Sequence, residues 1–181
     1  MLDRLKFNGD PVVVTGGGQV IGRSSCEALA ELGAHVIVVS KTEANVRETE
    51  QILRDSGASC EGHVTDVSIK AEVDALAAAV ARNHDHVKAV INNAGTNIRQ
   101  QPEEFTEAEW HTVLDTNLTS AFICSNAAYP EMKKAGGGKI INIGSMLSIF
   151  GASFSLAYAA SKGGIVQMSR VHATAWAKDN I

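Results

Sequence analysis

The fold is constrained most by an alternation of short apolar segments with helical segments, repeated five times along the chain. The apolar segments lie at 11–15, 35–40, 59–65, 87–92 and 139–145, and most are rich in β-branched residues. A strand that returns through a helix to a parallel neighbour makes a right-handed crossover, and strands that are apolar on both faces need helices on both sides. We therefore predict an α/β fold with a doubly wound parallel sheet.

The helical segments carry recognisable start and stop residues. Gly33 and Gly57 are expected to end the first two helices, Ser68 is expected to cap the third, and Thr106 with Glu109 predicts a capping box for the fourth. The first predicted helix ends at about residue 32. The other four are predicted at 43–56, 69–82, 106–134 and 157–178.

The composition is that of one soluble globular domain, which we assign to residues 1–181. Apolar residues make up 45% of the chain and charged residues 20%, and 16 basic against 20 acidic side chains give a net charge of -4. This mild acidity argues against nucleic acid or an anionic membrane as a partner. No apolar run reaches the roughly 18 residues that cross a bilayer. The start, MLDRLKFNGD, is too polar for a secretory signal. We expect a cytoplasmic protein.

The cysteines and the HxH pair predict no metal site. Cys26, Cys60 and Cys124 are far apart and singly placed, so we interpret them as small buried apolar residues. His84 and His86 lie in a polar connector and are interpreted as solvated surface.

The chain ends at AKDNI, at the end of a helix, without a following strand. The strand at 139–145 would then be an apolar sheet edge, which invites aggregation. We expect either that the chain is part of a longer protein or that a partner covers this edge.

The glycine-rich segment TGGGQVIG follows the first strand directly and opens a helix. Glycines at this place let the backbone approach a pyrophosphate, and a helix N-terminus offers free N–H groups and positive dipole charge. A tight strand–helix turn alone also needs glycine, so that alternative stays open. The cofactor-binding residues predicted in this segment are Thr15, Gly16, Gly18, Gln19, Ile21 and Gly22.

The residues after the second strand bear on the cofactor. A carboxylate at this position accepts from a ribose 2'-hydroxyl, whereas a base tolerates a 2'-phosphate. Here the strand ends in Ser40 and Lys41, with no acid before Glu43. This favours NADP, with NAD as the alternative, unless Lys41 is only a solvated surface residue.

Tyr158 and Lys162 are four residues apart and therefore share one face of the last predicted helix. A phenol has a pKa near 10, and a cation beside it favours the phenolate, so the pair suits proton transfer near neutral pH. Ser145 ends the preceding strand at the same rim of the sheet as the glycine turn. Its hydroxyl is predicted to hold a substrate oxygen.

These motifs resemble the short-chain dehydrogenase/reductase family over nearly the whole chain, from Pro11 to Ile181. The resemblance rests on TGGG with Gly22, on NNAG at 92–95, on DTNL around Asn117, on IGS around Ser145 and on YAASK at 158–162. It implies a Rossmann-like fold that is cut short at the C-terminal end, because the family continues into further strands and a substrate lid.

The resemblance also implies roles for individual residues. Tyr158 would be the general acid/base, Ser145 would orient the substrate oxygen, Lys162 would lower the tyrosine pKa and hold the nicotinamide ribose, and Asn117 would fix a water in a proton relay. The further cofactor-binding residues that it implies are Asp66, Val67, Asn93, Ala94 and Gly95. Asn92 and Asn93 have an alternative role in locking neighbouring strands together.

Within the family, TNIR at 96–99 and SMLSIFG at 145–151 look most like the sugar-acid branch, which includes gluconate 5-dehydrogenase and 2-deoxy-gluconate 3-dehydrogenase. Arg99 is a candidate to bind a substrate carboxylate through both guanidinium nitrogens. Its alternative is a surface arginine at the rim.

One departure from the family pattern concerns the glycine motif TGxxxGxG, because Val20 stands where the motif has glycine. A β-branched residue does not easily adopt positive φ. We expect either weakened cofactor affinity or a rebuilt turn.

The sequence thus predicts an oxidoreductase that transfers hydride between NADP(H) or NAD(H) and a secondary alcohol/ketone pair, with a sugar or sugar acid as the expected substrate. The predicted partners are a small-molecule substrate and further copies of the chain, in a homodimer or homotetramer. The alternatives left open are a non-catalytic, truncated homologue that acts as a binding subunit and a flavodoxin-like domain for another nucleotide.

Overall fold

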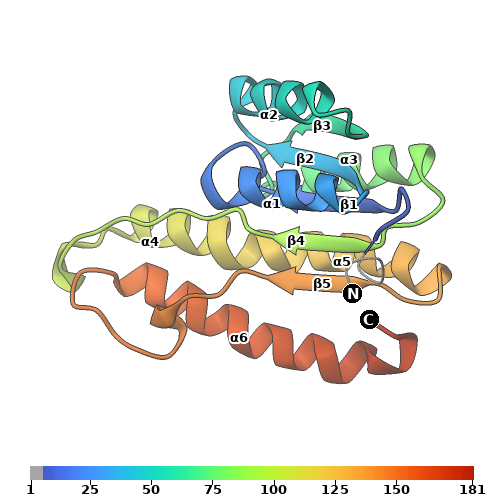
Figure 1. The fold of residues 1–181 in the computed structure, drawn as a ribbon. Helices are drawn as coiled ribbons and strands as arrows, with labels where there is room; N and C mark the ends of the chain where they lie inside the picture. The colour runs from blue at the N-terminus through green and yellow to red at the C-terminus, as the bar shows by residue number, and fades with distance from the viewer. Residues whose placement is uncertain (1–5) are drawn as a thin grey trace.

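The computed structural model describes residues 6–181, and these form a parallel five-stranded sheet in the order β3-β2-β1-β4-β5 (Figure 1). Every neighbouring pair of strands is parallel, so the predicted doubly wound α/β fold is confirmed. The strand order reverses beside β1, which leaves a crevice at the carboxyl ends of β1 and β4. The strands are β1 (Pro11–Thr15), β2 (His35–Ser40), β3 (Cys60–Val64), β4 (Ala89–Asn92) and β5 (Lys139–Asn142).

Helices cover both faces of this sheet. In Figure 1, α1 and α2 lie in front of the sheet, α3 and α5 lie behind it, and α6 runs along the side of β5. The helices are α1 (Val20–Glu31), α2 (Glu43–Asp55), α3 (Lys70–Asn83), α4 (Glu107–Leu114), α5 (Ser120–Lys134) and α6 (Leu156–Trp176). No helix of the described residues is long and apolar enough to cross a membrane.

The core has two layers because the central strands are apolar on both faces. Val12 and Val14 of β1 pack toward α1 and α2, whereas Val13 packs toward α3 and α5, and each is at most 7% exposed. Burying a valine side chain contributes about 1.5–3 kcal/mol to folding. These strands therefore hold the carboxyl edge of the sheet, where the candidate site lies, on a rigid base.

The long helix predicted at 106–134 is interrupted by a π-helical turn, η3 (Asp115–Thr119), between α4 and α5. The capping box of Thr106 and Glu109 that starts α4 is confirmed. The π turn was not predicted. It places the buried side chain of Asn117 toward the segment after β4, as described below, and such turns recur at functional sites.

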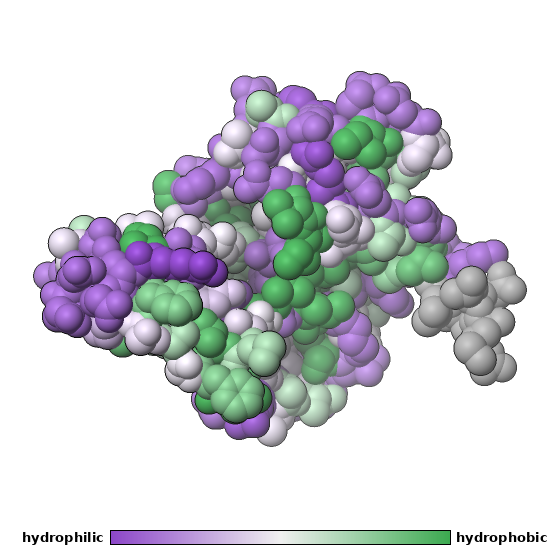
Figure 2. Space-filling view, turned by 60° about the vertical axis from the view of Figure 1, so that its left-hand side comes forward, coloured by the Kyte–Doolittle hydropathy of each residue, from purple (hydrophilic) through white to green (hydrophobic). Residues whose placement is uncertain are grey.

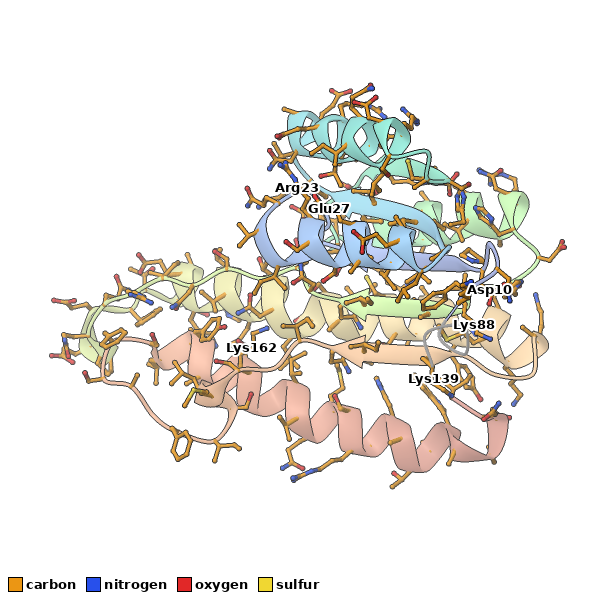
Figure 3. All side chains as sticks on the ribbon, in the orientation of Figure 1. Asp10, Arg23, Glu27, Lys88, Lys139 and Lys162 are labelled. Carbon is orange, nitrogen blue, oxygen red and sulfur yellow. The ribbon has the colours of Figure 1, made fainter. Side chains whose placement is uncertain are left out.

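Two local predictions were wrong. The third helix has Ile69 at its N-cap, because the hydroxyl of Ser68 donates to Asp66 Oδ1 at 2.6 Å instead of capping α3. The interpretation of His84 as solvated surface is also wrong, because its side chain is only 17% exposed, whereas that of His86 is 36% exposed. His84 Nε2 lies 3.3 Å from Glu61 Oε1, and His86 Nε2 lies 3.0 Å from Asp10 Oδ1. In Figure 3, Asp10 is labelled at the amino end of the sheet.

The two strands β4 and β5 are shorter than predicted. β5 ends at Asn142 rather than at residue 145, and β4 begins at Ala89 rather than at residue 87. Ile141 in β5 is 47% exposed, which agrees with the expected apolar edge.

Candidate active site

The glycine turn brings the start of α1 against the ends of β1 and β4. Gly16 has φ +65, and a Cβ there would come within 2.9 Å of Asn93 Nδ2. A Cβ at Gly22 would overlap the carbonyl oxygen of Gly16. Because no side chain caps the N-terminus of α1 and its first turn holds no acid, backbone N–H groups there remain available to an anion.

Val20 adopts the positive φ that a β-branched residue does not easily adopt. Its φ is +47, in the left-handed region, and α1 begins at this residue. The side chain is 76% exposed, so little packing compensates for the strained backbone. The turn keeps a glycine-like conformation with a valine in it.

Arg23 clamps the turn from the first helical turn of α1, where Figure 3 labels it. It donates from Nη2 to the carbonyl oxygen of Gly18 at 2.9 Å and pairs with Glu48 of α2 at 2.7 Å. The bond to Glu48 raises the pKa of Arg23. Sequence reasoning missed this clamp, since its second partner, Glu48, comes from another helix, α2.

A groove with a volume of about 310 Å³ lies beside the glycine turn, over the carboxyl ends of β1, β2 and β3. Most predicted cofactor-binding residues line it, namely Gly16, Gln19, Ile21, Gly22, Ser40, Lys41, Asp66, Val67, Asn93, Ala94 and Gly95. Residues that the sequence analysis did not predict to bind the cofactor also line it, namely Val20, Val39, Thr42, Asn45, Thr65 and Thr116.

Thr15 and Gly18, although predicted as cofactor-binding residues, do not line the groove but support its walls. The buried Thr15 Oγ1 accepts from the backbone N–H groups of Asn93 and Ala94, both at 3.1 Å. Asn93 Nδ2 in turn donates to the carbonyl oxygen of Thr15 at 3.0 Å. These bonds join the segments that follow β1 and β4.

Asn92 has the strand-locking role that the sequence analysis left as an alternative. Its Nδ2 donates to Asn142 Oδ1 of β5 at 2.8 Å and to Ser125 Oγ of α5 at 3.1 Å. This buried amide therefore connects β4 to a strand and to a helix, and it is not free to bind a ligand through Nδ2.

The groove has one acidic and one basic side chain among its lining residues, Asp66 and Lys41. Burial raises the pKa of Asp66, but hydrogen bonds from Ser68 and the charge of Lys41 outweigh it, so that the pKa lies below its usual value. Asp66 is thus a carboxylate near neutral pH. Lys41 is exposed at the end of β2.

Asn117 is 2% exposed and is fully hydrogen-bonded by neighbouring segments. Its Oδ1 accepts from the N–H of Thr96 at 2.7 Å, and its Nδ2 donates to the carbonyl oxygen of Thr96 at 2.9 Å and to Ser161 Oγ of α6 at 3.0 Å. A Cβ on Gly95 would meet Asn117 Oδ1 at 3.3 Å. Asn117 therefore joins the groove wall to the helix that carries Tyr158 and Lys162.

Lys162 lies buried between α6 and the segment after β5 (Figure 3) and is 4% exposed. Its Nζ donates to the carbonyl oxygen of Ile143 at 2.7 Å and lies 5.7 Å from the ring centre of Tyr158. Burial lowers the pKa of Lys162. The predicted pairing of these two side chains on one helix face is present, with Tyr158 half-buried.

Ser145 begins the short 3-10 turn η4 (Met146–Ser148) after β5. Its Oγ accepts from the N–H of Leu147 at 3.1 Å, and its own N–H donates to Ser148 Oγ at 3.1 Å. Because Oγ is occupied as an acceptor, the hydroxyl hydrogen is left to donate to another oxygen.

Two loops at this side extend beyond the strands, between β4 and α4 and between β5 and α6 (Figure 1). Arg99 of the first loop lies over the ring of Phe154 of the second, with its guanidinium carbon 5.4 Å from the ring centre. Apolar side chains gather among polar ones at this end of the molecule (Figure 2). The most exposed in the second loop are Met146, Ile149 and Phe150.

Comparisons with known proteins agree with this geometry. The family model described as short chain dehydrogenase matches residues 10–181. The chain therefore belongs to the short-chain dehydrogenase family, whose members are NAD(P)-dependent oxidoreductases.

Individual relatives cover the chain almost completely. A 2-dehydro-3-deoxy-D-gluconate 5-dehydrogenase of Bacillus subtilis is 36% identical over 99% of this chain and 70% of its own length. A chloroplastic tropinone reductase homologue of Arabidopsis thaliana is 34% identical over 99% of this chain and 56% of its own length. The solved structure of a gluconate 5-dehydrogenase from Burkholderia cenocepacia, in complex with NADP and tartrate, has a TM-score of 0.94 and 30% identity, over 99% of this chain and 71% of that one.

Proposed function

We propose that this chain carries a hydride-transfer centre that interconverts a secondary alcohol and a ketone. The observation that carries the proposal is the hydrogen-bonded path from Thr96, next to Gly95 of the groove, through Asn117 to Ser161 on the helix of Tyr158 and Lys162. When bound, a nicotinamide dinucleotide supplies or accepts the hydride. The uncapped start of α1 and the glycines against it fit the diphosphate of that cofactor.

The protein side of the reaction is a proton transfer and its support. Tyr158 gives its hydroxyl proton to the ketone oxygen in the reducing direction and takes it back in the other. Ser145 donates its free hydroxyl hydrogen to the same substrate oxygen. Lys162 places its ammonium 5.7 Å from the ring centre of Tyr158, and Asn117 holds the segment at Thr96 against α6.

NADP is the proposed cofactor in preference to NAD. Lys41 is the basic residue that lines the groove where the 2'-phosphate of an adenosine ribose would lie, and Asp66 lies beyond β3 rather than at the end of β2. The bound NADP of the Burkholderia cenocepacia structure supports the same choice.

A sugar or sugar acid is the proposed substrate. The names of the Bacillus subtilis and Burkholderia cenocepacia proteins support this class, and Arg99 is the candidate for the carboxylate. The exposed Met146, Ile149 and Phe150 favour a second candidate, a neutral ketone, as does the tropinone reductase homologue. Arg99→Ala separates the two, because a carboxylate contact requires a larger loss of kcat/KM on gluconate than on a neutral cyclic ketone. An equal loss of kcat/KM on both substrates would overturn the proposed contact between Arg99 and a substrate carboxylate.

The same proposal includes assembly of two or four copies in the cytoplasm. Phe122 of α5 and Val171 of α6 are both more than half exposed, and such apolar side chains on long helices fit a contact between copies. Light scattering on the purified chain would measure its mass in solution. The mass of a monomer at micromolar concentration would overturn the proposed assembly.

The test of the central proposal is a fluorescence titration of the folded chain with NADPH and with NADH. Saturable binding with tighter affinity for NADPH is expected, followed by oxidation of gluconate with NADP. A folded sample that binds neither cofactor would instead support the non-catalytic alternative, which the names of the relatives do not favour.

A further inference from the structure

Imidazole and carboxylate side chains gather at the edge of the sheet, on the side away from the proposed active site. His35 is the first residue of β2, Glu61 and His63 lie on β3, and His84 follows the last turn of α3. One ligand atom each from His35, Glu61 and His84 lies within 4.8 Å of the others. The proposed hydride-transfer centre uses none of these residues.

Strand register explains why these side chains share one face. Glu61 pairs with Ile37 and His63 pairs with Val39, so both project from the face on which Ile37 and Val39 pack against α3. His35 belongs to the same face by alternation along β2. The C-terminal end of α3 brings His84 over them, so the group lies at the rim of the core.

One pair within this group already has the separation of two ligands of a small cation. Glu61 Oε1 lies 3.3 Å from His84 Nε2. Two ligands of a tetrahedral zinc ion, each at about 2.0–2.2 Å, are separated by about 3.3–3.5 Å. The ligand atoms of all three side chains lie within 4.8 Å of one another, so His35 has to move toward this pair for the three to share an ion.

Among the described residues, one ligand atom of the group, on His35, has no hydrogen-bond partner. His35 Nδ1 lies 2.6 Å from Ser59 Oγ, which fixes the ring, while its Nε2 is buried with no hydrogen-bond partner. His63 Nε2 is likewise buried without one, although it lies near Glu61. A buried polar atom without a partner costs free energy, and a metal-bound imidazole is commonly held through its other nitrogen in this way.

We propose that His35, Glu61 and His84 form a binding site for a divalent first-row metal ion, with zinc as the best fit to two imidazoles and one carboxylate. A water molecule completes the coordination, and His63 orients the Glu61 carboxylate from outside. The ion would fasten the edge strand β3 to β2 and to the end of α3. Its role is structural, because His35 and Ser40 are at opposite ends of β2, about 16 Å apart along an extended strand.

The test is calorimetric titration of zinc chloride into the full chain, without affinity tag and after treatment with chelator. We expect one zinc ion per chain and a higher Tm with zinc. Glu61→Gln, which keeps the shape of the side chain, and His84→Ala should each weaken binding by at least about ten-fold. Circular dichroism would establish that both variants remain folded.

Two matched controls separate this site from other zinc-binding groups. His86→Ala removes a nearby imidazole that pairs with Asp10, and Cys60→Ser removes the thiol next to Glu61. Both should bind zinc like the unaltered chain. Absence of saturable binding, or unchanged affinity in both Glu61→Gln and His84→Ala, would overturn the site, and so would loss of binding in Cys60→Ser alone. NADPH titration of the same samples tests the hydride-transfer proposal independently.

Discussion

The two halves of the crevice at the carboxyl edge of the sheet are built in different ways. The nucleotide half, over β1, β2 and β3, is shaped by backbone turns that leave no space for added side-chain atoms, as at Gly16 and Gly22. The catalytic half, beside β4, β5 and α6, is shaped by side chains such as Asn117 and Lys162 that reach buried carbonyl groups.

Because of this difference, we expect substitutions in the two halves to change different properties of the protein. In the nucleotide half, a single added carbon changes where the backbone lies, and so it should alter cofactor affinity and stability together. In the catalytic half, the backbone is held by bonds away from the reacting hydroxyl of Tyr158. Removal of that hydroxyl should therefore change the rate and leave binding as it was.

Tyr158→Phe is expected to have the largest effect, because it removes only the hydroxyl that we propose as the proton donor. The kcat of alcohol oxidation should fall by about 10²–10⁴-fold, the range for loss of a general acid/base. The Kd for NADPH should stay within about two-fold, because the ring remains beside Lys162. Steady-state kinetics and fluorescence titration on one preparation measure both quantities. A loss of affinity as large as the loss of rate would erase the distinction between the two halves.

Gly22→Ala tests the nucleotide half, where we expect cofactor affinity and stability to change together. The added Cβ would overlap the carbonyl oxygen of Gly16, so the turn must move. We expect a free energy of unfolding lower by about 1–3 kcal/mol, as for overpacking elsewhere, and a large loss of NADPH affinity. Chemical denaturation and cofactor titration provide the two measurements.

The matched control for that variant is Gly57→Ala at the end of α2. Gly57 has φ +80 but no atom near its missing Cβ, so its cost is conformational only. Gly57→Ala should lower stability without changing NADPH affinity. If both variants lost affinity equally, the close approach of Gly22 to Gly16 would not be the cause.

Lys41→Ala should have a smaller and more selective effect. Lys41 is exposed, so stability should change little, while the preference for NADPH over NADH should fall by about five- to ten-fold through loss of a charged contact. The control is Lys70→Ala, which removes an exposed lysine outside the groove. An unchanged ratio in Lys41→Ala would assign the 2'-phosphate to another residue.

The sequence predicted the strand alternation, the glycine turn and the pairing of Tyr158 with Lys162 because each depends on local spacing. It did not predict the π turn at Asn117 or the clamp of Arg23. Asn117 bonds to Thr96 and Ser161, and Arg23 pairs with Glu48, and all of these partners are distant in the chain. The same reason explains why His84 was interpreted as solvated. Its partner, Glu61, lies on a different element and is recognisable only from strand register.

The smallest predicted effect concerns Val20, where the conformation of the turn and the residue type disagree. A left-handed backbone costs a residue with a Cβ roughly 1–2 kcal/mol relative to glycine. Because the Val20 side chain is 76% exposed and lines the groove, Val20→Gly loses little packing. Val20→Gly removes this backbone cost, but the greater freedom of glycine in the unfolded chain offsets part of the effect. The free energy of unfolding should therefore rise by about 0.5–1 kcal/mol.

The same substitution should tighten NADPH binding by a few-fold, since it removes a branched side chain from the path of the diphosphate. Val20→Ala serves as the control, because it removes the branching but keeps the Cβ and hence most of the backbone cost. If Val20→Ala tightened binding as much as Val20→Gly, the obstruction would be the side chain itself. If neither variant changed affinity, the turn would already hold its binding conformation, and the strain at Val20 would affect stability alone.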